Sequence, residues 1–289
     1  MQNYNTVASR NLIRAAMDML EHAMPVTVLG DFGTQREMPA VFLGHGSPMN
    51  AIEDNDFRRS WQALGKKLGK PKAILCISAH WETRGVYVTG SEHPETIHDF
   101  NGFPRALFDV QYRAPGSPEL AHRVIELLDT VRVHSDPNRG LDHGAWGVLQ
   151  PMFPEADIPV VQLSLSVLQP GAWHYDLAKL LAPLRDEGVL IVGSGNIVHN
   201  LRFFKFNDPT ACDWAVRFDE DVAEHIATGH HDGLLGYETL GTDALLAIPT
   251  PEHYLPLLYI LALQRDDEPV EFFNEQVNSS ISMRSVVIG

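Results

Sequence analysis

The sequence predicts an α/β fold, in which a single three-layer αβα domain is built on a largely parallel or mixed central sheet. Two observations favour this class. Short, continuously apolar runs alternate along the chain with amphipathic stretches, a pattern typical of strands that helices cover on both faces. These segments are also evenly spaced from about residue 38 onward. Even spacing favours one domain over two separate ones.

The expected elements follow one another along this domain. Continuous apolar runs predict strands, and apolar residues three or four positions apart predict helices. We expect strands at residues 39–43, 72–78, 86–89, 158–165, 189–192 and 282–288. We expect helices at residues 56–68, 118–129, 173–187, 213–228 and 250–264. Ser117 and Pro118 mark one helix start clearly, because Ser is a good N-cap and Pro suits the first helical position.

Residues 1–37 are expected to be an N-terminal extension, and residues 38–289 the main domain. Charged residues interrupt the weak helical pattern of the extension, which lacks the continuous apolar run of a signal peptide. No stretch of the chain approaches the length and apolarity of a membrane span. The expected location is therefore the cytoplasm.

The charge of the chain disfavours two classes of partner. Its formal net charge is −15, from 37 acidic and 22 basic residues. A surface of this sign repels phosphate backbones and anionic lipids, so we expect neither nucleic acid nor a membrane as partner.

The two cysteines, Cys76 and Cys212, form no CxxC pair. Cys76 lies in an apolar run and is expected to be buried. Homo-oligomerisation is left open.

Histidines stand at the ends of several expected elements. His45, His80 and His199 follow strands, His143 lies in an Asp-His-Gly segment, and His253 lies in the first turn of a helix. Ligands of α/β sheets collect beyond the carboxyl ends of the strands. Neutral imidazoles that meet there form a site for a divalent transition metal. We expect most other histidines to be exposed or capping residues, among them His22, His122, His174, His225, His230 and His231.

Glycines accompany these histidines. Gly44 and Gly46 flank His45, and Gly193 and Gly195 precede His199; glycine lets the backbone approach a ligand closely. The segment 193–195 lacks the third glycine and the helix of a dinucleotide fingerprint, and the sequence contains no Walker loop. The serine between the two glycines lacks the nucleophile-elbow pattern of a serine hydrolase.

Six segments of the chain resemble the class III extradiol ring-cleavage dioxygenases, most closely the DOPA 4,5-dioxygenase-type branch. The likeness covers roughly residues 38–289. The segments are Gly-His-Gly-Ser-Pro-Met (44–49), Ser-Ala-His-Trp (78–81), His-Asp-Phe (98–100), Asp-His-Gly (142–144), Gly-Asn-Ile-Val-His-Asn (195–200) and Pro-Glu-His-Tyr-Leu-Pro (251–256).

The resemblance implies one divalent metal ion, held by His45, His80 and His253. Glu252 stands beside His253, and because the wider family often uses a carboxylate as third ligand, the choice between the two stays open, with His253 favoured. His199 is implied to be the acid–base residue and is an alternative fourth ligand. Fe(II) is expected for activity, because it can bind O₂ beside a catechol, whereas Zn(II) also suits an all-histidine set but is redox-inert.

The implied reaction is the opening of a DOPA-like catechol ring with O₂. His143 is implied to be a second catalytic or substrate-contacting residue. Substrate contacts are implied for His98, Asp99, Asn196 and Tyr254. Two other functions are weighed beside this one: a zinc-dependent hydrolase that uses the same histidines, and a non-catalytic protein that binds a peptide in the cleft.

Overall fold

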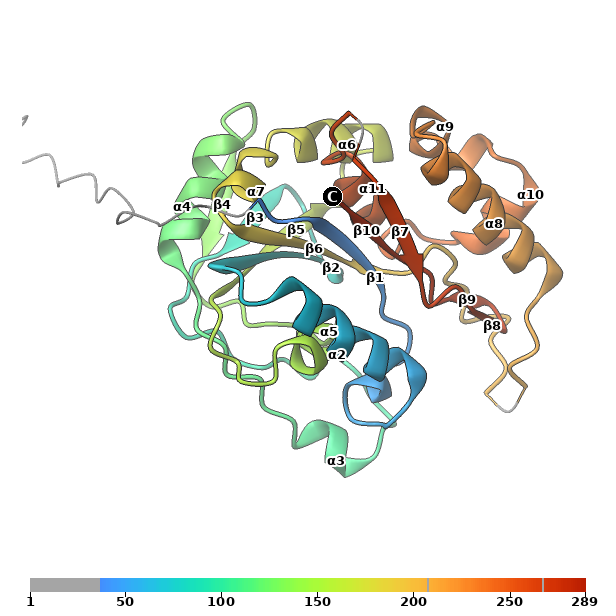
Figure 1. The fold of residues 1–289 in the computed structure, drawn as a ribbon, viewed down its shortest axis with the longest axis horizontal. Helices are drawn as coiled ribbons and strands as arrows, with labels where there is room; N and C mark the ends of the chain where they lie inside the picture. Colours follow the sequence, from blue (N-terminus) through green and yellow to red (C-terminus); the bar gives the residue numbers. More distant parts are fainter. Residues whose placement is uncertain (1–36, 207, 267) are drawn as a thin grey trace, which may run out of the picture. The chain divides into compact units, whose positions relative to one another are not determined.

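A mixed sheet of eight strands forms the centre of the described domain (Figure 1). The computed structural model describes residues 37–206, 208–266 and 268–289. The strands lie in the order β4-β3-β5-β2-β6-β1-β10-β7. Their bounds are β1 (Ala40–Gly44), β2 (Ala73–Thr83), β3 (Val86–Thr89), β4 (Val133–Asp136), β5 (Val160–Ser166), β6 (Val189–Gly195), β7 (Val270–Phe273) and β10 (Ser285–Ile288). The central strands β5, β2, β6 and β1 run parallel, whereas β3 and β10 run antiparallel to their inner neighbours.

Helices cover both faces of this sheet (Figure 1). The helices are η1 (Pro48–Ala51), α2 (Asp56–Leu68), α3 (Arg105–Phe108), α4 (Pro118–Leu127), α5 (His143–Met152), α6 (Gly171–Lys179), α7 (Pro183–Asp186), α8 (Asp213–Ala227), α9 (Asp232–Leu235), η2 (Tyr237–Thr239), α10 (Thr242–Ala247) and α11 (Leu255–Leu261). A two-stranded sheet of β8 (Val277–Asn278) and β9 (Ile281–Ser282) completes the described elements.

The side chains of β1 show how the two faces are filled. Val41 and Leu43 belong to a core cluster with Trp61 of α2 and Trp146 of α5, whereas Phe42 belongs to a second cluster on the other face, with residues of α6 and α11. Successive side chains of a strand point to opposite faces, so a strand buried on both sides is continuously apolar. The predicted three-layer α/β class is confirmed.

Two predicted helices differ from the structure because of proline. The helix expected over 173–187 is two helices, since α6 ends at Lys179 and α7 begins at Pro183; a proline inside a helix removes one hydrogen bond and clashes with the preceding turn. The helix expected from residue 250 begins at Leu255. His253 therefore lies in the turn that precedes α11, not in the first turn of the helix.

For three of the elements that the sequence did not predict, the reason can be identified. Strands β4 and β7 are partly exposed edge strands with mixed polar and apolar residues, so they show no continuous apolar run. Helix α5 is buried on nearly every side and contains glycines and Pro151. A helix that is apolar all round lacks the one-sided pattern by which helices are recognised.

Several smaller expectations are also decided by the structure. Cys76 is fully buried, as predicted. The expectation of exposure is wrong for His174, which is fully buried and lies 3.0 Å from the Tyr259 hydroxyl and 3.1 Å from the Ser166 carbonyl oxygen. The helical pattern expected within residues 1–37 lies almost entirely outside the described residues. None of the helices in the described ranges is long and apolar enough to cross a bilayer.

Candidate metal centre

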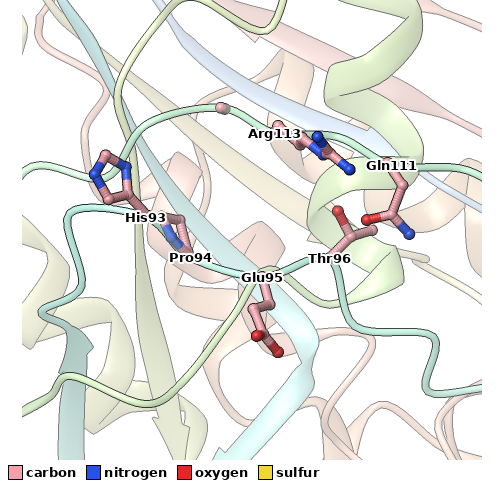
Figure 2. A pocket seen from close by; sticks show the side chains of 7 residues that line it. His93, Pro94, Glu95, Thr96, Gln111 and Arg113 are labelled. Carbon is pink, nitrogen blue, oxygen red and sulfur yellow. The ribbon is translucent and has the colours of Figure 1, made fainter.

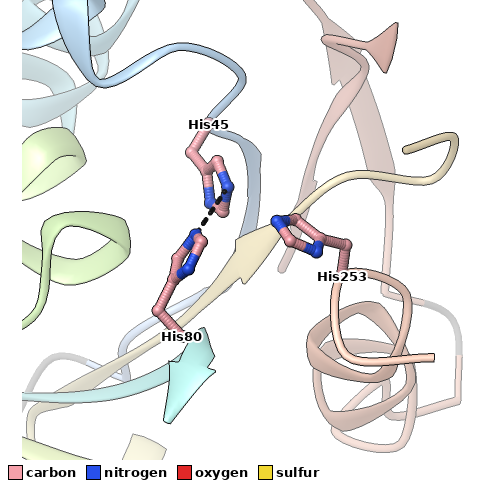
Figure 3. Close-up of side chains that lie close together, drawn as sticks. All are labelled: His45, His80 and His253. Atoms are coloured by element: carbon pink, nitrogen blue, oxygen red, sulfur yellow. Dashed lines mark hydrogen bonds between the residues drawn. The ribbon is translucent and has the colours of Figure 1, made fainter. Parts of the chain in front are cut away.

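Three histidines from distant parts of the chain meet at the carboxyl ends of the parallel strands (Figure 3). His45 follows β1, His80 lies near the end of β2, and His253 precedes α11. One potential ligand atom of each lies within 4.8 Å of those of the other two. The ring centroids are 5.0 to 5.2 Å apart, and the Nε2 atoms of His45 and His80 are 3.4 Å apart.

Strand β6 brings His253 into this group. The backbone N–H of Asn196, just past β6, donates to the carbonyl oxygen of His253 over 2.9 Å. A Cβ atom at Gly195 would lie 2.1 Å from the same carbonyl oxygen, which is far inside contact distance. A glycine is therefore required at the end of β6 for the turn carrying His253 to come this close.

Hydrogen bonds to the outer ring nitrogens fix the tautomers of two of these histidines. The Ser194 hydroxyl donates to the carbonyl oxygen of Gly144 over 2.5 Å, so it must accept from Nδ1–H of His45, 3.0 Å away. Nδ1–H of His253 donates to the Glu252 carboxylate over 3.0 Å. Both arrangements leave the Nε2 lone pair free, as is typical of histidines that bind a metal.

The histidines of this cluster are neutral at pH 7. Burial and the neighbouring imidazoles hold the pKa of His45 and of His253 well below the ordinary value. Burial, together with the nearby His143, lowers the pKa of His80 to about 4. Neutral nitrogen donors with convergent lone pairs suit a divalent transition metal, so the residues present fit such an ion.

A second group of side chains adjoins the first through His80. The rings of His80 and His143 have centroids 3.9 Å apart, and Oδ1 of Asp99 lies 2.9 Å from Nδ1 of His143 and accepts its backbone N–H. Burial raises the pKa of Asp99, but the contacts with His143 and His80 outweigh it and lower that pKa to about 2. Asp99 is thus a carboxylate beside the cluster, and it orients His143.

His199 lies against His253 in a different geometry. The two rings are stacked, with centroids 3.5 Å apart and planes 8° from parallel, and His199 groups with Glu252 and His253, not with His45 and His80. Lone pairs in two parallel ring planes do not converge on one ion. This arrangement disfavours His199 as a fourth ligand. Burial lowers the pKa of His199 to about 4.

Three residues that were expected to contact substrate instead lie against backbone carbonyl oxygens of other segments. Tyr254 is fully buried, and its hydroxyl donates to the carbonyl oxygen of Leu234; this expectation is corrected, because the side chain packs in the core. Asn196 is buried, and its Nδ2 donates to the Ser282 carbonyl oxygen, so it holds backbone segments together. The Nε2 atom of His98 lies 3.0 Å from the Val110 carbonyl oxygen.

Two cavities differ in their relation to the cluster. A cavity of about 10 Å³, room for about one water molecule, is lined by His45, Trp61 and His143 among others. A pocket of about 460 Å³ is lined by residues 93–96, 111, 113 and 114, and Figure 2 shows polar side chains such as Arg113 around it. None of the clustered histidines lines this larger pocket, so its size alone is no indication of the site of chemistry.

Comparison with known proteins decides the family. The model of a family described as the catalytic LigB subunit of aromatic ring-opening dioxygenase matches residues 38–287. The chain belongs to this family. It is 51% identical over 260 residues to a protein of Escherichia coli (strain K12) named 4,5-DOPA dioxygenase extradiol, a match that covers 87% of this chain and 95% of that protein.

Two further LigB-family comparisons agree with this assignment. A protein of the same name from Beta vulgaris is 42% identical over 248 residues, which covers 83% of this chain and 92% of that protein. A crystal structure of an uncharacterized protein from Escherichia coli K12 has a TM-score of 0.76 and 46% identity, and covers 87% of this chain and 100% of its own.

Membership of the LigB family decides among the three functions considered from the sequence, which are a dioxygenase, a hydrolase and a binding protein. The chain is a metal-dependent extradiol dioxygenase, an enzyme that opens an aromatic ring with O₂. The hydrolase and the non-catalytic binding protein are therefore set aside. Among the described residues, three overlapping groups could hold a metal ion: His45, His80 and His253; His80, Asp99 and His143; and His199, Glu252 and His253.

Proposed function

We propose that this enzyme opens the ring of a DOPA-like catechol at an iron centre whose protein ligands are His45, His80 and His253. The observation that carries the proposal is the convergence of these three side chains, whose potential ligand atoms lie within 4.8 Å of one another. Three protein ligands leave positions open for a substrate and for O₂. A ferrous ion bound there would supply the redox chemistry of O₂ activation and would acidify the catechol hydroxyls.

His253, not Glu252, is the proposed third ligand. Oε1 of Glu252 already accepts hydrogen bonds from Nδ1 of His253, at 3.0 Å, and from the hydroxyl of Thr250, at 2.9 Å. A carboxylate that accepts the outer N–H of an imidazole orients the ring and increases its basicity as a ligand. Glu252 therefore supports His253 from outside the centre.

His199 is the proposed acid–base residue. Its neutral ring can take a proton from a catechol hydroxyl and return it as the ring opens. Stacking against His253 places it beside the proposed centre without making it a ligand. His143, held by Asp99, is the proposed second residue facing the substrate.

The proposed substrate class rests on the relatives and on the donor set. Two relatives, 51% and 42% identical to this chain, are named 4,5-DOPA dioxygenase extradiol. Iron is proposed over zinc because zinc has no redox chemistry with which to activate O₂, although three imidazoles suit either ion.

The test is an assay of purified enzyme that is loaded anaerobically with Fe(II) and then mixed with O₂ and a panel of catechols. We expect O₂ consumption and the yellow ring-fission product with DOPA, and much lower rates with catechols that lack its side chain. Zinc-loaded enzyme is the control and should consume no O₂. Equal turnover with zinc, or no turnover of any catechol by the iron-loaded enzyme, would refute the proposal.

A further inference from the structure

The backbone of His80 lies at a gap in the strand pairing. Strand β2 is in register with β5 up to Ile77 and again from Glu82, with a shift between them, and with β6 up to Ser78. Among the described residues, His80 thus has no register partner in either neighbouring strand. A side chain on such a segment depends on other contacts for a fixed position.

Two side chains bind the peptide groups of His80 instead. Its backbone N–H donates to Oγ of Ser78 over 3.2 Å, and its carbonyl oxygen accepts from Nη2 of Arg139 over 3.2 Å. Both of these side chains also bind the carboxylate of Asp142, through the Ser78 hydroxyl at 2.6 Å and the same Nη2 atom of Arg139 at 2.9 Å. One carboxylate therefore holds both of the groups that fix His80.

Asp142 is fully buried, and each of its carboxylate oxygens has two donors. Oδ1 accepts from Ser78 and from the backbone N–H of Ala145, at 3.1 Å. Oδ2 accepts from Arg139 and from Nε2 of Gln162, at 2.8 Å. A buried carboxylate is costly unless hydrogen bonds of this kind compensate its lost hydration. Its four contacts are all donors, so an amide of the same shape could not satisfy them.

The same carboxylate also orients the helix that carries His143. Asp142 is the N-cap of α5, whose first residue is His143. The rings of His80 and His143 lie 3.9 Å apart between centroids, and a Cβ atom at Gly144 would lie 2.8 Å from Cδ2 of His80. The start of α5 and the end of β2 are thus packed against each other around Asp142.

We propose that Asp142 is a positioning residue, which fixes the ring of His80 for metal binding through Ser78 and Arg139. The proposal rests on the proposed function, because it takes His80 as a ligand. Asp142 itself touches neither metal nor substrate in this account. Removal of its charge loosens the contacts that hold the His80 backbone. The affinity of the centre for metal then falls, although Asp142 is not a ligand.

The test is the metal affinity of Asp142→Asn, measured with Co(II) by competition against a chelator, together with the Co(II) absorption spectrum. The variant keeps the shape of the side chain but turns an amide NH₂ toward two donors. Loss of partners that orient metal ligands typically weakens metal binding by about 10- to 100-fold. We expect a rise of this size in the Co(II) Kd and a changed spectrum, in protein whose circular dichroism remains native.

Glu268→Gln is the matched control. Glu268 accepts hydrogen bonds from the fully buried Arg185 over 2.6 and 2.8 Å, so this variant also removes a carboxylate charge that pairs with an arginine. Arg185 donates to the Met38 carbonyl oxygen, close to where β1 begins, whereas His45 follows the end of β1. We expect a lower Tm with an unchanged Co(II) Kd and spectrum.

The outcomes separate this inference from the proposed function. If His80→Ala loses Co(II) binding while Asp142→Asn keeps the wild-type Kd and spectrum, the role of Asp142 is refuted and the metal centre stands. If His80→Ala binds Co(II) as well as the wild type does, both proposals fail. Should Asp142→Asn not fold, Ser78→Ala carries the test, since it removes the contact on the His80 N–H. An unchanged Kd in Ser78→Ala would then refute the inference.

Discussion

At the scale of single residues, the stacked pair of His199 and His253 separates two roles that similar side chains could fill. His253 donates Nδ1–H to Glu252 and so directs Nε2 toward His45 and His80. His199 lies parallel to that ring, 3.5 Å away between centroids. A ligand and an acid–base residue can therefore stand side by side while only one of them binds the ion.

This difference predicts the outcome of His199→Ala. The variant should retain about one metal ion per chain and lose turnover by about 100-fold or more, the usual contribution of a positioned acid–base group. His80→Ala is the comparison, and it should lose the metal itself. Elemental analysis and steady-state assays of both variants check the prediction. A large loss of metal from His199→Ala would show that His199 is a ligand after all.

At this scale the sequence indicates which residues stand together at strand ends, but not the direction of side chains that packing determines. His45 and His80 could be placed together because the carboxyl ends of parallel strands share one edge of the sheet. Tyr254 follows His253 directly, yet its side chain points into the core, a direction that neighbouring elements determine. The sequence shows Asp142 only as part of an Asp-His-Gly motif, because its role depends on Ser78, Arg139 and Gln162, which are brought together only by folding.

At the scale of elements, glycines allow segments to approach the sheet. Gly195→Ala would place a Cβ atom 2.1 Å from the carbonyl oxygen of His253, so the turn before α11 must move. We expect a loss of about 1–3 kcal/mol of unfolding free energy, typical of overpacking, and weaker metal binding. Chemical denaturation and metal titration measure the two effects.

Gly147→Ala is the matched control for that prediction. Gly147 lies inside α5, where an added Cβ would meet nothing within 4 Å. Alanine in a helix interior is favoured over glycine by about 0.5–1 kcal/mol, so this variant should be at least as stable as the wild type. Equal destabilisation by both substitutions would contradict the steric account of Gly195.

The sequence predicts the bounds of some elements more accurately than those of others. Helix α2 was predicted with its exact bounds, 56–68, because only one of its faces is apolar. Strand β2 extends five residues beyond its expected end, to Thr83, since the polar residues after Ile77 interrupt the apolar run without ending the extended backbone. His80 is thus part of the strand and not of a following loop.

At the scale of the whole molecule, burial of His174 links stability to pH. Burial lowers the pKa of His174 to about 4, below its value of about 6.5 in an unfolded chain. Because the folded state favours the neutral ring, this contribution to stability is complete above pH 6.5 and is lost as the pH falls toward 4. Each unit of pKa difference corresponds to about 1.4 kcal/mol.

His174→Gln tests this linkage, since the glutamine amide can both donate and accept a hydrogen bond but does not titrate. We expect the variant to be less stable than the wild type at pH 7 and to lose less stability between pH 7 and pH 5. Urea denaturation at several pH values measures both slopes. Parallel slopes for the two proteins would show that His174 does not titrate on unfolding.

The most direct measurement of the central claim is the position of iron in crystals of the enzyme grown anaerobically with Fe(II). Anomalous scattering at the iron edge locates the ion independently of its ligands. The account predicts one peak, about 2.1 Å from a ring nitrogen of each of His45, His80 and His253. A peak between His80, Asp99 and His143, or between His199, Glu252 and His253, with none at the predicted position, would contradict it.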